Sequence, residues 1–196
     1  MAEEKKFQPL HLEYTFQASP TSVYDAWITK TVAELWLFKN ETNQLNFEST
    51  LEKGGRFSVI EYDGEKKIDH WGEWLEINRP NTLHFTLEVP AHFEGISEVL
   101  IEVKETPGGT QLVFTQKNID TSKTETAWKG MLARLDEVLK QPYLATIHSG
   151  KNEIIPAVVV VAMQVVGLAR SAGQRAKLWW PTPLPRVLHF VVVSRS

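Results

Sequence analysis

The sequence predicts an α+β fold in which a curved antiparallel sheet wraps around one long helix at the C-terminal end of the folded region. The first observation is a helical pattern of apolar residues between Ser122 and Lys140. The second is a series of short segments before it, most of which alternate apolar and polar residues as half-buried strands do. The third is the shortness of the intervening turns, because parallel neighbours need crossover connections of about a dozen residues or more.

The long helix is expected over residues 122–140. Its apolar residues recur at intervals of three and four, so they form one stripe along the helix surface. Ser122 and Glu125 have the spacing of a capping box, which predicts the first turn. Pro142 predicts the end, because the residue before a proline avoids the helical region. Such a helix needs a sheet to cover its apolar stripe.

The strands are expected before this helix, with two short helices after the first strand. Ser19-Pro20 predicts a helix start, because serine is a good cap and proline fits the first helical position. Asp63-Gly64 suits a tight hairpin turn, and Gly72 inside a strand suggests a bulge or a bend. The expected segments are strand 11–18, helices 23–27 and 32–38, and strands 45–51, 57–62, 66–77, 83–89, 99–103 and 112–114.

Composition narrows the class of protein. The chain has 196 residues, of which 42% are hydrophobic and 23% are charged, as in a globular domain. It has no cysteine, which excludes disulfides, thiolate metal sites and cysteine nucleophiles. The first residues lack the apolar segment of a secretory signal, so a cytoplasmic location is expected. The net charge is −3, and the acidic excess before residue 141 argues against a nucleic-acid partner.

Residues 142–196 differ in composition, so we expect residues 1–141 to form the folded domain and this tail to form no independent one. The tail has one acidic residue, Glu153, and its apolar run at 154–169 is shorter than the roughly 20 residues of a spanning helix. Three explanations remain open, in this order: an aberrant C-terminus such as a frame-shifted one, a tail that docks on a partner or membrane surface, and a membrane anchor. A membrane partner is expected only through this tail.

No catalytic motif stands out in the sequence. His70 and Glu73 are three residues apart on one strand and point to opposite faces unless Gly72 introduces a bulge, so an exposed histidine and carboxylate are expected. His92 and Glu94 belong to a loop. Because no residues have the spacing of metal ligands, we expect no metal ion, no cofactor and no catalytic residue.

Several stretches of the chain resemble one known family. They are FQASPTSVYDAW, ELW, GGRFSV, WGEWLEINRPNTLHFT, EVLIEVKETPGGTQLVFTQ and AWKGMLARLDEVL. Across residues 10–140 they resemble the family named for the activator of Hsp90 ATPase, within the helix-grip superfamily of START lipid-transfer domains, Bet v 1 allergens and polyketide cyclases. The resemblance implies a helix-grip fold. The family's last helix usually starts with adjacent Gly and Trp, whereas here Trp128 precedes Gly130, which leaves the local contact between helix and sheet open.

Aromatic residues are the best indication of a site. A helix-grip fold would place some tryptophans between sheet and helix, where they either pack as core or line an apolar cavity. Gly130 either allows close packing against a strand or leaves room for a ligand. Trp71 and Leu75 share the inner strand face if Gly72 adds no bulge, and Trp74 replaces Trp71 if it does. The expected cavity residues are Trp36, Trp71, Trp74, Leu75, Phe85, Trp128 and Leu132.

Three functions follow as hypotheses. The first is a small cytoplasmic protein that binds an apolar or amphipathic ligand between the sheet and the long helix. The resemblance implies the second, a partner of an Hsp90-type chaperone, although nothing in the sequence resembles the separate N-terminal domain that makes much of the eukaryotic activator's Hsp90 contact. The third is a cyclase-like enzyme that uses the same cavity, for which His70 and Glu73 are the candidate acid or base. We rank them in that order, so an enzyme is not expected.

Overall fold

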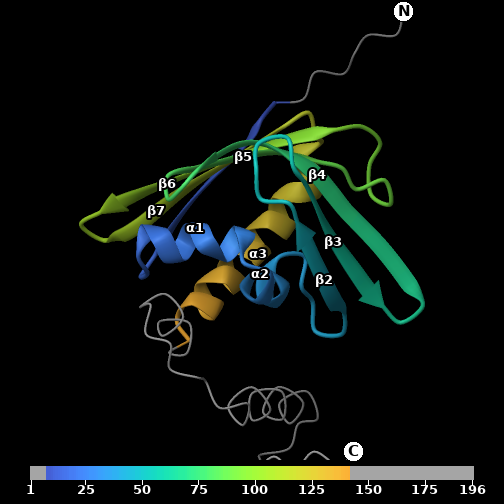
Figure 1. Cartoon of the computed structure of the whole chain (residues 1–196), viewed down its shortest axis with the longest axis horizontal. Coiled ribbons are helices and arrows are strands. Elements are labelled where there is room, and N and C mark those ends of the chain that lie inside the picture. Colours follow the sequence, from blue (N-terminus) through green and yellow to red (C-terminus); the bar gives the residue numbers. More distant parts are fainter. Residues whose placement is uncertain (1–7, 142–196) are drawn as a thin grey trace, which may run out of the picture. The chain divides into compact units, whose positions relative to one another are not determined.

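The computed structural model describes residues 8–141, which form one seven-stranded sheet with three helices on its concave side (Figure 1). The elements are β1 (Leu10–Phe16), α1 (Pro20–Ile28), α2 (Lys30–Trp36), β2 (Gln44–Ser49), β3 (Arg56–Asp63), β4 (Lys66–Asn78), β5 (Thr82–Leu87), β6 (Ser97–Thr106), β7 (Gly109–Lys117) and α3 (Thr121–Leu139). The strand order is β1-β7-β6-β5-β4-β3-β2, and every neighbouring pair is antiparallel. The predicted α+β helix-grip fold is therefore confirmed.

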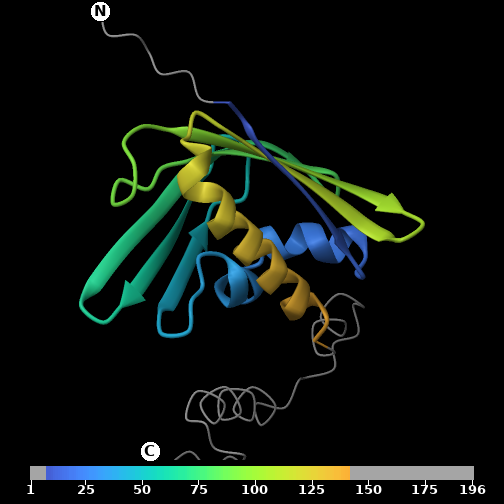
Figure 2. The same ribbon diagram turned by 180° about the vertical axis from the view of Figure 1, so that it is seen from behind.

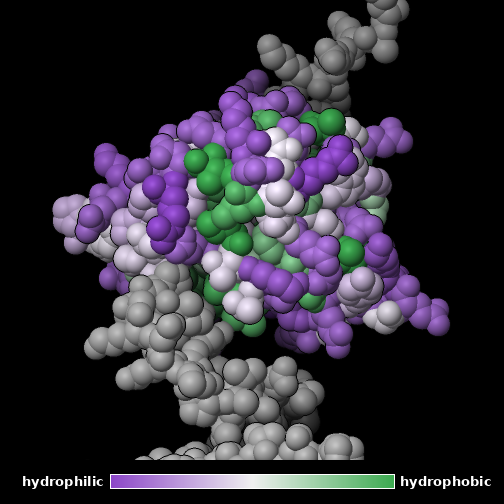
Figure 3. All heavy atoms as spheres, viewed as in Figure 1, coloured by the Kyte–Doolittle hydropathy of each residue, from purple (hydrophilic) through white to green (hydrophobic). Residues whose placement is uncertain are grey.

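The predicted tail, residues 142–196, lies outside the described residues, as do residues 1–7. The domain boundary after residue 141 and the three explanations of the tail therefore stay predictions. Among the described residues, no helix is long and apolar enough to cross a membrane. The face drawn in Figure 3 is mostly hydrophilic, with apolar residues gathered near its middle.

Helix α3 runs diagonally across the concave face of the sheet (Figures 1 and 2). The capping box predicted from Ser122 and Glu125 is wrong, because the cap is Asp120, whose side chain accepts a hydrogen bond from the Ser122 amide at 3.2 Å. Glu125 instead pairs with Lys129 at 2.6 Å along the exposed face. The apolar stripe faces the sheet as predicted. Its buried residues are Trp128, Leu132, Leu135 and Val138.

Strand β4 differs from the prediction at its bulge. The alternation of faces passes regularly through Gly72, and the irregularity lies between Trp74 and Glu76 in the pairing with β5. A Cβ atom on residue 72 would lie 1.8 Å from the carbonyl oxygen of Thr86, so glycine is needed for the close approach of the β5 backbone. His70 and Trp74 consequently share the buried inner face.

The predicted cavity residues Trp71 and Leu75 do not lie on that inner face. Trp71 pairs with Ser58, whose two neighbours on β3 are buried, so Trp71 points to the outer face. Leu75 lies in the bulge and lines a shallow surface depression of about 460 Å³ together with Leu51. The expectation that Trp71 and Leu75 share the inner face is wrong although Gly72 adds no bulge, because His70, Gly72 and Trp74 are the inward-facing positions of β4.

Helix α1 begins where the sequence predicts. Ser19 is the cap and its hydroxyl accepts a hydrogen bond from the Ser22 amide at 3.1 Å, while Pro20 occupies the first helical position. The Arg79 guanidinium donates two hydrogen bonds to Asp25, at 2.7 and 2.8 Å, which tie α1 to the turn between β4 and β5. These contacts hold α1 against the concave side of the sheet.

Helices α1 and α2 cover a closely packed cluster that we call the aromatic core: Trp27, Trp36, Phe57, Trp74 and Phe85. The Trp27 and Trp36 rings meet edge to face with centroids 4.6 Å apart. Trp36 is fully buried, and its indole N–H donates to the carbonyl oxygen of Ala26 at 3.0 Å. The space left between these rings and their neighbours is only about 10 Å³. This part of the concave side is filled by side chains.

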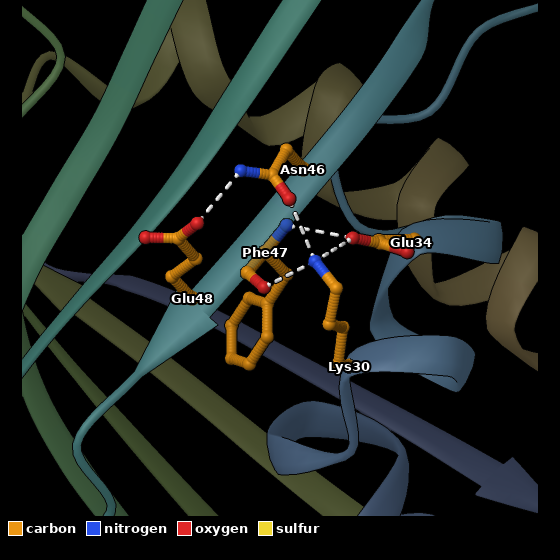
Figure 4. A network of polar contacts seen from close by, with 5 residues as sticks. All are labelled: Lys30, Glu34, Asn46, Phe47 and Glu48. Atoms are coloured by element: carbon orange, nitrogen blue, oxygen red, sulfur yellow. Dashed lines mark hydrogen bonds and ion pairs between the residues drawn. The ribbon is translucent and has the colours of Figure 1, made fainter.

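Helix α2 is also bound to strand β2 by side chains that reach its backbone (Figure 4). The Glu34 carboxylate accepts a hydrogen bond from the Phe47 amide at 2.8 Å, and the Lys30 ammonium donates to the Phe47 carbonyl at 2.7 Å. Lys30 also donates to Glu34 at 2.6 Å and to the Asn46 side chain at 2.7 Å. Both backbone groups of one residue are thus satisfied from the neighbouring helix.

Candidate ligand-binding cleft

A cleft of about 980 Å³ lies beside the aromatic core, on the concave side of the sheet. Its walls come from α3 between Thr124 and Arg134, from the β5–β6 loop at residues 92–94, and from the segment that follows α2. Figure 2 shows the first half of α3, in yellow, facing this loop and the long strands β3 and β4. Phe38, Leu87 and Trp128 border both the cleft and the small residual space of the aromatic core, so they form the partition between them.

The cleft has a largely apolar floor. Trp128, from α3, is buried and packs on the ring of Phe114 with centroids 4.3 Å apart. The ring centroids of Phe38 and Trp128 are 5.9 Å apart. The backbone φ of Phe38 is 56°, which is uncommon for a bulky residue. This backbone turn directs the Phe38 ring into the partition, and its amide donates to the sulfur of Met131 at 3.2 Å. The apolar side chains of the lining belong to Phe38, Leu87, Val89, Phe93, Ile119, Ala127, Trp128 and Met131.

His70 is the buried ionisable residue of the floor, 3% exposed, so the expectation of an exposed histidine is wrong. Its ring stacks on Phe38 with centroids 3.8 Å apart and an interplanar angle of 18°. Nδ1 lies 3.2 Å from the Val59 carbonyl oxygen, which can only accept, so Nδ1 carries the proton and Nε2 keeps a lone pair. Burial lowers the pKa of His70 to about 4. The imidazole is therefore uncharged at neutral pH.

Gln116 fixes the orientation of Trp128 from beneath the cleft. Its side-chain oxygen accepts a hydrogen bond from the Trp128 indole N–H at 2.8 Å. Its amide nitrogen donates to the Ser97 hydroxyl at 3.0 Å, which in turn donates to the carbonyl of Leu87 at 2.9 Å. These buried polar groups are all paired, so the indole is held in one position as part of a rigid floor.

Two basic residues lie in the cleft wall, Lys39 after α2 and Arg134 on α3. The Lys39 ammonium donates to the carbonyl oxygen of Asn43, and Glu61 accepts from the Asn43 side-chain amide at 2.7 Å. Partial burial lowers the pKa of Lys39, the positive charge of Arg134 lowers it further, and the negative charge of Glu61 opposes both. The wall thus places two cations within electrostatic reach of each other.

Gly130 lines the cleft on α3, where a Cβ atom would meet no atom within 4 Å. The packing explanation of this glycine is therefore wrong, because no strand approaches it. The open space beside Gly130 agrees with the alternative explanation, that this glycine leaves room for a ligand. The side chain of residue 130 is the simplest means of testing whether the cleft is used.

The predicted cavity residues divide into four groups. Trp128 lines the cleft. Trp74 and Phe85 border only the small space of the aromatic core, and Trp36 and Leu132 are buried without lining either space. Trp71 and Leu75 lie away from the inner face, as described above. Their common role in binding a ligand stays a prediction, and for all except Trp128 the cleft offers no direct contact.

The two candidate acid or base residues of the enzyme hypothesis, His70 and Glu73, also lie in different places. His70 lies in the cleft, whereas Glu73 follows Gly72 onto the outer face, where its amide donates to the Thr86 hydroxyl at 2.9 Å. His92 and Glu94 do belong to a loop, as predicted, and this loop forms part of the cleft wall.

Sequence reasoning missed Phe38, Lys39, Gln116 and Arg134. Phe38 and Lys39 lie at a chain reversal where the sequence has no glycine to announce a positive φ. Arg134 has the spacing of an exposed helix position and gives no signal of its own. Gln116 was detectable in principle, because it lies on the inward side of an alternating strand, where a polar residue needs a partner.

Solved structures with the same fold share little sequence with this chain. A protein from Chromobacterium violaceum has a TM-score of 0.62 at 19% identity, and the match covers 68% of this chain and 97% of that one. A protein from Nitrosomonas europaea has a TM-score of 0.58 at 21% identity, with coverage of 68% and 94%. An AHSA1-like protein from Aeromonas hydrophila has a TM-score of 0.60 at 18% identity, with coverage of 70% and 95%. At this identity the likeness shows the fold alone.

Sequence comparison assigns the family. Among curated proteins, none matches this chain. The family model described as activator of Hsp90 ATPase homolog 1-like protein matches residues 17–140, which include every element from α1 to α3. This match spans more than half of the chain and agrees with the fold. The chain therefore belongs to the family of activator of Hsp90 ATPase homolog 1-like proteins.

Proposed function

We propose that this protein binds an apolar or amphipathic small molecule in the cleft between α3 and the sheet. The observation that carries the proposal is the cleft itself, whose volume of about 980 Å³ is of the size that small-molecule sites have. Its lining combines apolar side chains with polar and charged ones, and polar groups that orient a ligand against an apolar surface are usual in such sites.

The lining suggests how a ligand would be held. An apolar body would lie against Trp128, Phe38 and Met131, and burial would favour binding by about 25 cal/mol for each Å² removed from water. The rigid floor needs no reorganisation, because Trp128 is already hydrogen-bonded to Gln116. The Nε2 lone pair of His70 would accept a hydrogen bond from a hydroxyl or amide of the ligand, which adds specificity.

The test is titration with N-phenylnaphthylamine, a neutral apolar dye whose fluorescence rises when it leaves water. We expect saturable binding to the wild-type protein and a loss of at least tenfold in affinity for Gly130→Trp, which places an indole in the cleft. Gly130→Ala is the matched control and should bind as the wild type does, since its added methyl group meets open space. Leu132→Trp is a poorer choice, because Leu132 is 1% exposed and its enlargement would overpack the core.

Absence of saturable binding to the wild type would contradict the proposal. Unchanged affinity in Gly130→Trp would contradict it equally, since the dye would then bind elsewhere. Circular dichroism of both variants separates a filled cleft from an unfolded domain.

The family name supports a second candidate function, an interaction with an Hsp90-type chaperone. The matching family model carries the activator of Hsp90 ATPase in its description. Capture of the purified protein on an immobilised Hsp90-type chaperone tests it, with Gly130→Trp as a second sample. Chaperone binding that survives Gly130→Trp would identify a surface separate from the cleft.

A further inference from the structure

We infer that the ligand of the cleft is an anionic amphiphile, whose negatively charged group is bound between Lys39 and Arg134. This inference rests on the proposed function and names the chemical class of the ligand. The shared chemistry is a carboxylate, sulfonate or phosphate attached to an apolar body.

The two cations have donors to spare. An ammonium has three N–H donors, and Lys39 uses one of them on the Asn43 carbonyl. A guanidinium has five, and among the residues that the structure describes Arg134 forms no ion pair and donates no side-chain hydrogen bond. Arg79, by contrast, donates two hydrogen bonds to the Asp25 carboxylate. Arg134 is therefore a cation in a cleft wall that lacks an anionic partner within the described chain.

Lys39 and Arg134 carry like charges in the same cleft wall. The charge of Arg134 contributes to lowering the pKa of Lys39, so the two cations repel each other across a partly buried site. Glu61 offsets only part of this repulsion, and its carboxylate is already bonded to the side-chain amides of Asn40 and Asn43. An anion placed between Lys39 and Arg134 would remove the repulsion and form charge-assisted hydrogen bonds with both.

Besides Glu61, the acidic residues that line the cleft are Asp120 and Glu94, and they come from other parts of the chain than Lys39 and Arg134. Asp120 caps α3, where it accepts hydrogen bonds from the Ser122 amide and hydroxyl. Glu94 belongs to the β5–β6 loop. Thr124 and Arg134 are ten residues apart on α3, so the cleft extends about 15 Å along the helix, from near the Asp120 cap to Arg134. A ligand with one anionic end and an apolar body matches this polarity.

Two dyes with the same apolar body test the inference. Anilinonaphthalene sulfonate carries a sulfonate that N-phenylnaphthylamine lacks. We expect the sulfonate to bind the wild type roughly tenfold more tightly, which corresponds to one or two charge-assisted hydrogen bonds. Arg134→Gln should remove most of this difference and leave the affinity for the neutral dye unchanged. Arg134→Glu should reverse the preference.

A control variant removes the same charge outside the cleft. Lys104, exposed on β6, does not line it, so Lys104→Gln should keep the preference for the sulfonate. Equal affinities of the two dyes for the wild type, or an equal loss in Lys104→Gln and Arg134→Gln, would overturn the inference while neutral-dye binding upholds the proposed function. Failure of both dyes to bind would overturn both. Stronger competition by decanoate than by decanol extends the result from sulfonates to carboxylates, and equal competition would confine it to sulfonates.

Discussion

Two neighbouring regions of the concave side, the aromatic core and the cleft, are built from similar residues and reach opposite outcomes. Both contain tryptophan and phenylalanine, and both lie under α3 or beside it. The aromatic core leaves about 10 Å³ unfilled, whereas the cleft leaves about 980 Å³. Trp128 borders both the cleft and the residual space of the aromatic core. Composition therefore does not decide which aromatic residues line a cavity.

The helices α1 and α2 account for the difference. They bring Trp27 and Trp36 into the concave side next to β3, β4 and β5, and thereby fill it. Among the described residues, no second helix fills the cleft beside the first half of α3. Gly130, on this part of α3, adds no side chain to it. The sheet of this fold is long enough to cover both a packed core and a cleft. The short helices α1 and α2 determine where the packed core ends and the cleft begins.

The largest expected effect is on stability when the aromatic core is opened. Trp36→Ala should lower the free energy of unfolding by about 3–5 kcal/mol, because it leaves a cavity and removes the hydrogen bond to Ala26. Phe93→Ala, in the half-buried wall of the cleft, should cost less than about 1 kcal/mol, because it enlarges a space that already exists. Urea denaturation of both variants measures the contrast. Equal losses would show that the cleft residues are as tightly packed as the core.

The next effect concerns His70, which belongs to the cleft but is buried like a core residue. Its pKa is about 4 when folded and near 6.5 in the unfolded chain, so between these values only the unfolded chain binds the proton. The free energy of unfolding should therefore fall as pH is lowered from about 6.5 to 4, by up to about 3 kcal/mol. His70→Gln should lack this contribution.

Denaturation of the wild type and of His70→Gln at several pH values checks this prediction. The difference in stability between the two proteins should change across this pH range. Parallel curves for wild type and His70→Gln would mean that His70 is solvated in solution, and the floor of the cleft would then be open.

The smallest effect is a gain in stability at Gly130. Gly130→Ala should raise the free energy of unfolding by about 1 kcal/mol, because alanine favours the helix and its methyl group meets open space. Thermal unfolding followed by circular dichroism should show a higher Tm. A loss of stability would place a neighbouring group against residue 130 and remove the room that the proposed ligand needs.

Sequence patterns predicted the fold well because its strands alternate and its turns are explicit. The β3–β4 turn lies where Asp63-Gly64 indicates it, with Gly64 and Glu65 between the paired Asp63 and Lys66 and Gly64 at φ 62°, and Ser19 and Pro20 start α1. The bulge in β4 was misplaced, because Gly72 reflects the approach of a neighbouring backbone, which single-strand patterns do not contain. Asp120 was overlooked as the α3 cap, because two acceptable caps lie two residues apart.

The site was harder to predict than the fold. Alternation identifies Phe85 and Trp74 as inward-facing, but it does not say whether an inward side chain meets another side chain or empty space. That outcome depends on the placement of α1 and α2 against the sheet, which tertiary contacts determine. The position of Phe38 depends on a positive φ that no local residue type predicts.

The hydrogen bonds between α2 and β2 affect how the protein associates with other molecules. Strand β2 is the last strand of the sheet, and such a strand normally offers its unpaired backbone groups to a strand of another chain. At Phe47 both groups are already occupied by Lys30 and Glu34, so a second chain that docked there would have to displace an ion pair and two hydrogen bonds (Figure 4). Helix α2 thus hinders another chain from extending the sheet at the edge strand β2, and so disfavours intermolecular aggregation there.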